Sequence, residues 1–233
     1  MGMPTINQVL RPLGLNLQRW HQPLEDIPAL LGNSRITTIV DGGAYKGNKA
    51  AVLLEKFPDA NVYCFEPQPE LFSHLTKRFV NTPHCIPVNQ ALSASPGNAD
   101  LFITDERYTS SLMQPLAADI KTAATQEVSV TTLDHFMQEN QINSIDIIKL
   151  DLQGNELPAL QGGKNALAGC KAVLVEVNFR ERYAGCTRVE ELFAHLQGAG
   201  FALYKIYEIH GYPNGAWKLG DALFLKQELL ATE

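Results

Sequence analysis

Short apolar runs alternate with amphipathic segments along most of the chain, and this pattern predicts alternating strands and helices. Runs rich in β-branched residues, such as Ile-Thr-Thr-Ile-Val at 36–40, are typical of buried strands. The predicted strands cover residues 36–40, 61–65, 84–89, 145–152 and 172–177. The predicted helices cover residues 47–57, 69–80, 132–140, 155 to about 162, and 189–199. This alternation is typical of a parallel sheet with right-handed crossovers.

Three segments depart from the alternation. Residues 93–131 form a long insertion, with short strands expected at 99–104 and 127–131 around a polar loop; long loops in compact domains are often functional. Residues 201–209 and 222–225 predict a final pair of strands, which makes five parallel strands and a hairpin-like pair. Residues 1–34 form an apolar, proline-punctuated leader of short helices, and residues 35–233 form a single domain.

The composition limits the classes of function. The chain has 233 residues, of which 45% are hydrophobic, and a net charge of −6. The size suits one domain with a sizeable core, and the negative charge argues against nucleic-acid binding. No apolar stretch approaches the roughly 18 residues of a membrane helix, and no signal-peptide pattern opens the chain. Four cysteines without a C-x-x-C spacing indicate a reduced, cytoplasmic protein without a zinc site.

A glycine-rich turn follows the first predicted strand. Residues 40–47 read Val-Asp-Gly-Gly-Ala-Tyr-Lys-Gly, and Glu66-Pro67 ends the next strand. A strand, a glycine turn, a helix and an acid after the next strand form a nucleoside-binding half-fold, in which Glu66 accepts hydrogen bonds from two ribose hydroxyls. The spacing is D-x-G-x-x-x-G, and Asp41 would repel the pyrophosphate of a dinucleotide. S-adenosylmethionine carries an ammonium group and no phosphate, so it fits this turn better.

Two alternatives for the turn fit less well. A phosphate-binding P-loop needs Lys-Ser/Thr directly after its last glycine, whereas Asn48-Lys49 follows Gly47. A tight turn without any ligand would explain the glycines, but it would leave Glu66-Pro67 without a reason.

A wider set of motifs resembles the FkbM family of S-adenosylmethionine-dependent methyltransferases. Beyond the glycine turn and Phe65-Glu66-Pro67, the resemblance covers residues 91–93 (Ala-Leu-Ser), 110–112 (Ser-Ser-Leu), 132–134 (Thr-Leu-Asp), 148–156 (Ile-Lys-Leu-Asp-Leu-Gln-Gly-Asn-Glu) and 175–177 (Val-Glu-Val). These motifs span about 40–177 in the order of the family. One departure is Gln153, where the family more often has Glu; we do not expect this position to be essential to the chemistry.

The resemblance implies a fold and an activity. The implied fold is the Rossmann-like class I methyltransferase α/β fold, with a seven-stranded, mostly parallel mixed sheet, an antiparallel last strand and helices on both faces. The implied activity is methylation of a hydroxyl on a saccharide or small natural product. The matching motifs and the turn together give the expected cofactor-binding residues: Asp41, Gly43, Tyr45, Gly47, Glu66, Pro67, Gln90 and Ala91.

Ligands of open α/β sheets lie beyond the carboxyl ends of the strands, which singles out Asp41, Glu66, Gln90-Ala91, Asp151 and Asn178. The candidates for catalysis are Asp151, Glu176 and His210. Asp151 follows a strand and can act as base, orient a hydroxyl, ligate a metal or merely cap a turn. Glu176 lies in an apolar strand and needs a partner, either structurally with Lys149 or in the site. His210 falls in a loop at the ligand face, where a solvated histidine is the alternative. Glu156 either interacts with a helix dipole or takes part in the site.

Three segments at the same edge are expected to bind the acceptor, namely residues 108–111, 178–183 and 208–217, although polar loops at the surface can also be merely solvated. The second segment presents Arg182 among other hydrogen-bond donors. The expected acceptor residues are Ser110, Ser111, Asn178, Arg180, Tyr183, Tyr212 and Trp217. Oxygen ligands from Asp151, Glu176 and Asn178 would suit a divalent metal, but their spacing is not diagnostic, and we predict no metal.

Two other classes of function stay open at this point. A non-catalytic nucleoside-binding domain would keep the fold, but it would not need Asp41, Glu66 and Asp151 together. An NAD-type oxidoreductase is disfavoured by the glycine spacing.

Overall fold

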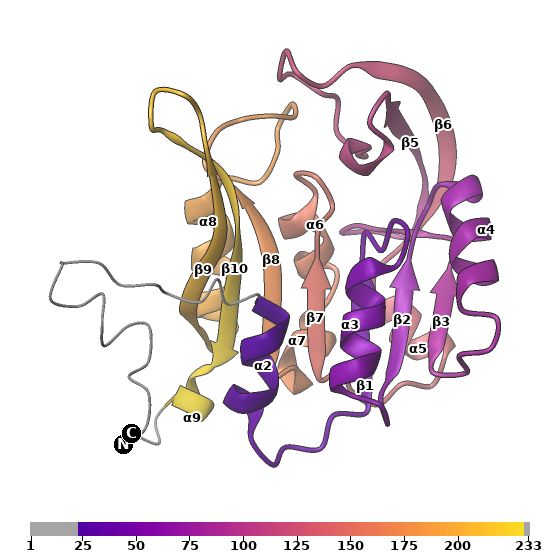
Figure 1. Ribbon diagram of the computed structural model, residues 1–233. Coiled ribbons are helices and arrows are strands. Elements are labelled where there is room, and N and C mark those ends of the chain that lie inside the picture. The colour runs from indigo at the N-terminus through magenta and orange to yellow at the C-terminus, as the bar shows by residue number, and fades with distance from the viewer. Residues whose placement is uncertain (1–22, 231–233) are drawn as a thin grey trace, which may run out of the picture.

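A seven-stranded sheet forms the centre of the computed structural model, which describes residues 23–230 (Figure 1). The strand order is β3-β2-β1-β7-β8-β10-β9; the first five strands are parallel, and β10 is antiparallel to both neighbours. This order confirms the predicted fold and its antiparallel last strand. The strands are β1 (Thr38–Gly42), β2 (Asn61–Phe65), β3 (Cys85–Val88), β7 (Ile147–Leu150), β8 (Ala172–Asn178), β9 (Phe201–Gly211) and β10 (Trp217–Lys226).

Helices cover both faces of this sheet, because its central strands are apolar on both sides. Ile147 and Ile148 are neighbours on β7, yet each belongs to a different buried cluster. The first cluster packs under α5 (Leu133–Glu139), α6 (Glu156–Gln161), α7 (Lys164–Gly169) and α8 (Val189–Gly198). The second packs under α2 (Pro23–Leu31), α3 (Asn48–Lys56) and α4 (Pro69–Arg78), and α9 (Gln227–Leu230) contributes partly buried leucines. Two cores separated by a sheet are the expected result of strands that are apolar throughout.

The insertion at 93–131 folds as a second, smaller sheet. Its strands are β4 (Ala91–Leu92), β5 (Gly97–Thr104) and β6 (Thr122–Thr131), in the order β4-β6-β5, and the short helix η2 (Arg107–Thr109) lies between β5 and β6. Figure 1 shows this sheet beyond the carboxyl ends of β2 and β3, across from the turn that joins β9 and β10. The smaller sheet and the turn between β9 and β10 therefore flank the edge where the parallel strands end.

Several elements differ from the sequence-based expectation. β6 and β10 are longer than predicted: the added residues 122–126 of β6 are mostly exposed and pair with β5, whereas the added residues 217–221 of β10 pair with β8 and β9. β9 extends only two residues past its predicted end, to Gly211. Helix α7 was not predicted. Thr132 caps α5, accepting from the His135 amide at 3.0 Å. Asn155 stands at the start of α6, but its side chain makes no capping bond and instead donates to the Leu92 carbonyl at 2.8 Å.

The predicted leader is described only in its last part. Helix α2 buries Leu24, Ile27 and Leu31 in the same core as α3, and Tyr207 of β9 donates to Asp26 at 2.7 Å. Residues 1–22 lie outside the described range, so the boundary at residue 34 stays a prediction. Over residues 23–230, no helix combines the length and the apolar character needed to cross a membrane. All four cysteines are buried free thiols.

Candidate functional site

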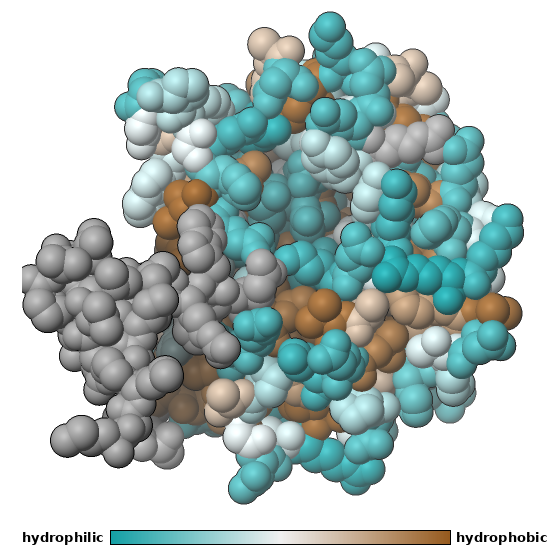
Figure 2. Space-filling model, in the orientation of Figure 1, coloured by the Kyte–Doolittle hydropathy of each residue, from teal (hydrophilic) through white to brown (hydrophobic). Residues whose placement is uncertain are grey.

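A cavity of about 620 Å³ opens at the carboxyl ends of the parallel strands. Its walls come from the turns after β1, β2 and β7, from the insertion, and from β9 and β10. Hydrophilic residues dominate this upper part of the molecule in Figure 2. The cavity spans the place where the strand order reverses between β1 and β7, which is where open α/β sheets bind their ligands.

The glycine turn after β1 fits against the turn after β7. Gly43 has φ +73°, and a Cβ there would lie 1.9 Å from the Asp151 carbonyl oxygen, so only glycine can occupy this position. The amides of Gly43 and Ala44 donate to the Phe65 carbonyl at 3.1 and 3.0 Å. This close contact of main chains fixes one wall of the cavity.

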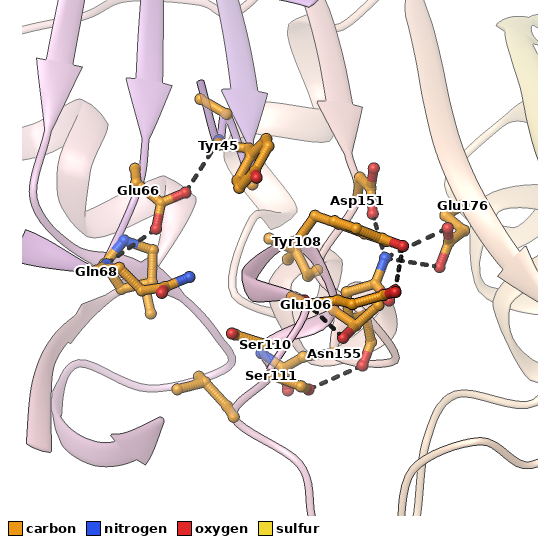
Figure 3. A pocket seen from close by; sticks show the side chains of 18 of the residues that line it. Tyr45, Glu66, Gln68, Glu106, Tyr108, Ser110, Ser111, Asp151, Asn155 and Glu176 are labelled. Atoms are coloured by element: carbon orange, nitrogen blue, oxygen red, sulfur yellow. Dashed lines mark hydrogen bonds between the residues drawn. The ribbon is translucent and has the colours of Figure 1, made fainter. Parts of the chain in front are cut away.

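Glu66 sits at the end of β2 and faces the cavity, with 4% of its surface exposed (Figure 3). Its two carboxylate oxygens each accept one main-chain bond, from Tyr45 at 3.0 Å and from Gln68 at 2.9 Å. A carboxylate oxygen has a second lone pair, so Glu66 can accept two further bonds. Burial raises the pKa of Glu66 to about 7, despite these main-chain bonds, which lower it.

Asp41 does not lie at the lip of the turn, which corrects its predicted contact with a ligand. Its side chain is fully buried, and the carboxylate is 2.8 Å from Nζ of Lys149, its direct neighbour across β1 and β7. Nζ of Lys149 also donates to the carbonyls of Gly42 and Gly43. Burial alone would lower the pKa of Lys149, but the carboxylates of Asp41, Asp151 and Asp221 together outweigh it and raise this pKa above its ordinary value. Of the two alternatives left open for Glu176, the structural pair with Lys149 is therefore not formed, and Glu176 lines the cavity.

Gly47 is also outside the cavity lining, contrary to its predicted role. It has φ +78°, and a Cβ there would lie 2.5 Å from the Phe79 ring. Glycine is therefore needed at this position so that the start of α3 can pack against α4. The other predicted cofactor residues line the cavity, namely Gly43, Tyr45, Glu66, Pro67, Gln90 and Ala91.

Asp151 and Glu176 line the opposite part of the cavity and are bridged by the Gln153 amide (Figure 3). Nε2 of Gln153 is 2.6 Å from the Asp151 carboxylate and 3.2 Å from that of Glu176, and Oε1 accepts from the Tyr183 hydroxyl at 2.7 Å. Gln153 adopts φ +56°, a conformation that is rare outside glycine. The residue that we expected to be inessential thus lies at the centre of this group.

Glu156 holds the turn that carries these residues. Its Oε1 accepts from the amides of Leu152 and Gly154 at 2.9 and 3.1 Å, and only 1% of the residue is exposed. Burial raises its pKa to about 7. Burial and the neighbouring Asp151 and Glu156 also raise the pKa of Glu176 well above its ordinary value, which favours its protonated form.

Only part of the predicted acceptor set lines the cavity. Ser110 and Ser111 do, and Ser111 donates to the Gln153 carbonyl at 2.8 Å. His210, the third predicted catalytic residue, also lines the cavity, but from strand β9 and not from a loop. The other five predicted acceptor residues do not line it; two are buried, and three are exposed or half-buried elsewhere: Asn178, Tyr183, Arg180, Trp217 and Tyr212.

Local packing explains two of these misplacements. Tyr183 is fully buried and donates to the Thr109 carbonyl at 3.0 Å, so it supports the wall from behind. Trp217 packs edge-on against Phe179 with ring centres 5.1 Å apart.

Some lining residues were not singled out by the sequence. Glu106, Asp119 and Lys218 face the cavity from the insertion and from β10, where no motif marks them. Within residues 23–230, no group of three or more His, Cys, Asp or Glu side chains is arranged to hold a metal ion. Asn178 lies outside the lining, so the oxygen-rich trio considered from the sequence does not face one space.

Comparison with known proteins gives one family and two curated relatives. The model of the methyltransferase FkbM domain matches residues 41–203. The hexuronic acid methyltransferase AglP of Haloferax volcanii is 29% identical over 143 residues, covering 59% of this chain and 54% of that protein. The 2-O-methyltransferase NoeI of Sinorhizobium fredii is 28% identical over 159 residues, covering 63% and 65%. The chain thus spans between half and two thirds of the length of these relatives.

Solved structures share the fold. An FkbM methyltransferase from Methylobacillus flagellatus superposes with a TM-score of 0.55 at 17% identity, covering 84% of this chain and 45% of that one. An rRNA methylase from Streptococcus thermophilus gives a TM-score of 0.52 at 10% identity, covering 90% and 99%. TrmK of M. capricolum, in complex with S-adenosylhomocysteine, gives 0.51 at 12% identity, covering 90% and 70%.

Proposed function

Because the chain belongs to the FkbM methyltransferase family, we propose that it methylates a hydroxyl of a saccharide or small natural product with S-adenosylmethionine. The observation that carries this proposal is one cavity with two different ends. One end presents Glu66 beside the glycine turn, and the other presents Asp151 and Glu176 joined through Gln153.

The first end suits the nucleoside part of the cofactor. Glu66 has lone pairs left for two ribose hydroxyls, and Gly43 lets the turn that carries the Tyr45 amide pack directly on the main chain of Asp151. Gln90 and Ala91 line the same part of the wall and offer contacts for a flat base. A related fold, that of TrmK, binds S-adenosylhomocysteine, which supports the same cofactor here.

The second end suits removal of a proton. We assign Asp151 as the group that accepts the proton of the acceptor hydroxyl while the hydroxyl oxygen bonds to the methyl carbon. When bound, S-adenosylmethionine supplies that methyl group, and the electron pair of the broken carbon–sulfur bond stays on sulfur. Gln153 donates to the Asp151 carboxylate and thereby orients it. Asp151 afterwards releases the proton to water. Glu176, whose buried carboxyl favours the protonated form, can donate to the acceptor or to Asp151.

The acceptor class rests on the polar walls and on the relatives. Ser110, Ser111 and His210 offer hydrogen bonds to hydroxyl groups. The two curated relatives are named for a hexuronic acid and for a 2-O-methylation. We also propose that residues 35–233 form the catalytic domain and residues 1–34 its leader.

Glu66→Ala is expected to lower the affinity for S-adenosylmethionine at least about tenfold. The variant loses two hydrogen bonds from a charged acceptor, each worth roughly 1.5–3 kcal/mol. Isothermal calorimetry measures this, and Glu55→Ala, which removes an exposed glutamate from α3, serves as the control. Equal affinities in wild type and Glu66→Ala would refute the ribose assignment. Calorimetry with NAD in place of S-adenosylmethionine tests the oxidoreductase alternative, and binding without any methyl transfer would favour the non-catalytic one.

The affinity for S-adenosylmethionine is also expected to fall as the pH drops below 7. Burial raises the pKa of Glu66 to about 7, so the charged form that accepts from the ribose is lost on acidification. The expected loss approaches tenfold per pH unit below about pH 6, the limit for a single protonation. In Glu66→Gln, which has no carboxyl group to protonate at this position, this loss of about tenfold per pH unit should be absent from the pH dependence of the affinity. An identical pH profile in both proteins would show that another group causes it.

A further inference from the structure

Arg182 is a buried cation at the wall of the cavity with hydrogen-bond donors to spare. It follows β8, lines the cavity, and has only 4% of its surface exposed. Over the described residues, its Nε and Nη1 make no hydrogen bond. Its nearest opposite charge is Asp119 Oδ2, 3.6 Å from Nη1, which is an ion pair but too long for a hydrogen bond. A buried guanidinium with unmatched donors is costly to the fold, so its presence beside a cavity favours an anionic ligand.

A second cation faces the same carboxylate. Nζ of Lys218, on β10, is 2.8 Å from Asp119 Oδ2, and Lys218 also lines the cavity. Asp119 belongs to the insertion and its side chain is 56% exposed. One carboxylate therefore already lies between Arg182 and Lys218, which shows that this chemistry fits there.

Over residues 23–230, Asp119 is the only acid that forms an ion pair with Arg182 or Lys218. Asp151 and Glu176 are hydrogen-bonded to Gln153, and the charge of Arg182 only partly offsets the rise in the pKa of Glu176. The two cations therefore share one exposed carboxylate as their ion-pair partner.

We propose that the acceptor is an acidic saccharide of the uronic-acid class, whose carboxylate binds Arg182 and Lys218 while a separate hydroxyl is methylated. The proposal rests on the proposed function and names its substrate class. The planar guanidinium can bind a carboxylate through two parallel hydrogen bonds, and Lys218 adds a point charge. Asp119 is then the internal carboxylate that the acceptor displaces.

The test is calorimetry on the protein saturated with S-adenosylhomocysteine, which needs no turnover. The probes are the methyl glycosides of glucuronic and galacturonic acid, each paired with its neutral hexoside. At least one uronide should bind about tenfold or more tighter than its neutral partner. Arg182→Gln should abolish this preference and Lys218→Gln should reduce it. Arg188→Gln removes the same charge from an exposed arginine paired with Glu190, and it should keep the preference.

The most discriminating result is an increase in the affinity for the uronide in Asp119→Asn. Asp119→Asn removes the competing carboxylate from an exposed side chain, so it should bind the uronide several-fold tighter and the neutral hexoside unchanged. Equal binding of every uronide and its neutral partner would overturn the proposal, as would a preference that survives both Arg182→Gln and Lys218→Gln, or weaker uronide binding in Asp119→Asn. If the preference is present but no hydroxyl is methylated, the proposed function fails and the carboxylate site stands. If neutral glycosides are methylated and no preference for uronides exists, the carboxylate site fails and the proposed function stands.

Discussion

Asp151→Asn is expected to bind S-adenosylmethionine about as well as the wild type and to methylate its acceptor at least about 10²-fold more slowly. Asparagine keeps the size of the side chain and an oxygen that can still accept from Gln153, whose Nε2 lies 2.6 Å from the Asp151 carboxylate. It cannot take up a proton. Glu66 and the glycine turn lie at the other end of the cavity, so the cofactor should be unaffected.

Single-turnover kinetics and calorimetry on the same preparation separate these two effects. Asp221→Asn is the matched control, because Asp221 is a half-buried carboxyl of β10 that pairs with Glu176 in the sheet but does not line the cavity. It should retain most of its turnover. Full activity in Asp151→Asn would reassign Asp151 to a structural role in the turn after β7.

Lys149→Met is expected to lower the free energy of unfolding by about 3–5 kcal/mol, the usual cost of leaving a buried charge without its partner. Asp41 is fully buried and lies 2.8 Å from Nζ of Lys149. The same Nζ donates to the carbonyls of Gly42 and Gly43, so the variant also loosens the glycine turn. Denaturant unfolding followed by circular dichroism gives the loss.

Two comparisons identify the cause of that loss. Asp41→Asn combined with Lys149→Met removes both charges and should recover part of the stability. Lys171→Met breaks the ion pair with Asp146, in which the Lys171 side chain is 30% exposed. It should lower the free energy of unfolding clearly less than Lys149→Met does. If Lys149→Met proved no more harmful than Lys171→Met, the buried pair would not be a major source of stability.

The sequence predicted the parallel strands well because they are apolar on both faces and short. β2 begins and ends where the sequence placed it, at Asn61 and Phe65. The first half of β6 and the start of β10 escaped prediction: residues 122–126 are small or polar and mostly exposed, and residues 217–221 follow a loop with no regular apolar alternation. The glycine turn and Glu66 were recognised since their chemistry depends on neighbours close in sequence.

Contacts between distant segments were the part that the sequence did not reveal. Asp41 and Lys149 are 108 positions apart and meet only because β1 lies beside β7. Without that strand order, the sequence indicated Asp41 as a ligand of the cofactor and left Lys149 open as one possible partner of Glu176. Asp119, Arg182 and Lys218 come from three different elements, so no local pattern could bring them together.

The smaller sheet forms no strand pair with the larger one. β5 forms a ladder with β6 and an isolated bridge with Ser111, and β6 pairs with β5 and β4. Residues 109–117 are bound to the turn after β7 and to residues 182–184, whereas β5 and the exposed first half of β6 are not. These two strands can therefore accumulate substitutions without disturbing the register of the strands that carry Glu66 and Asp151. Evolution can thus alter which acceptor is chosen while the transfer machinery is inherited intact, and the same division offers protein engineers a segment to exchange between relatives.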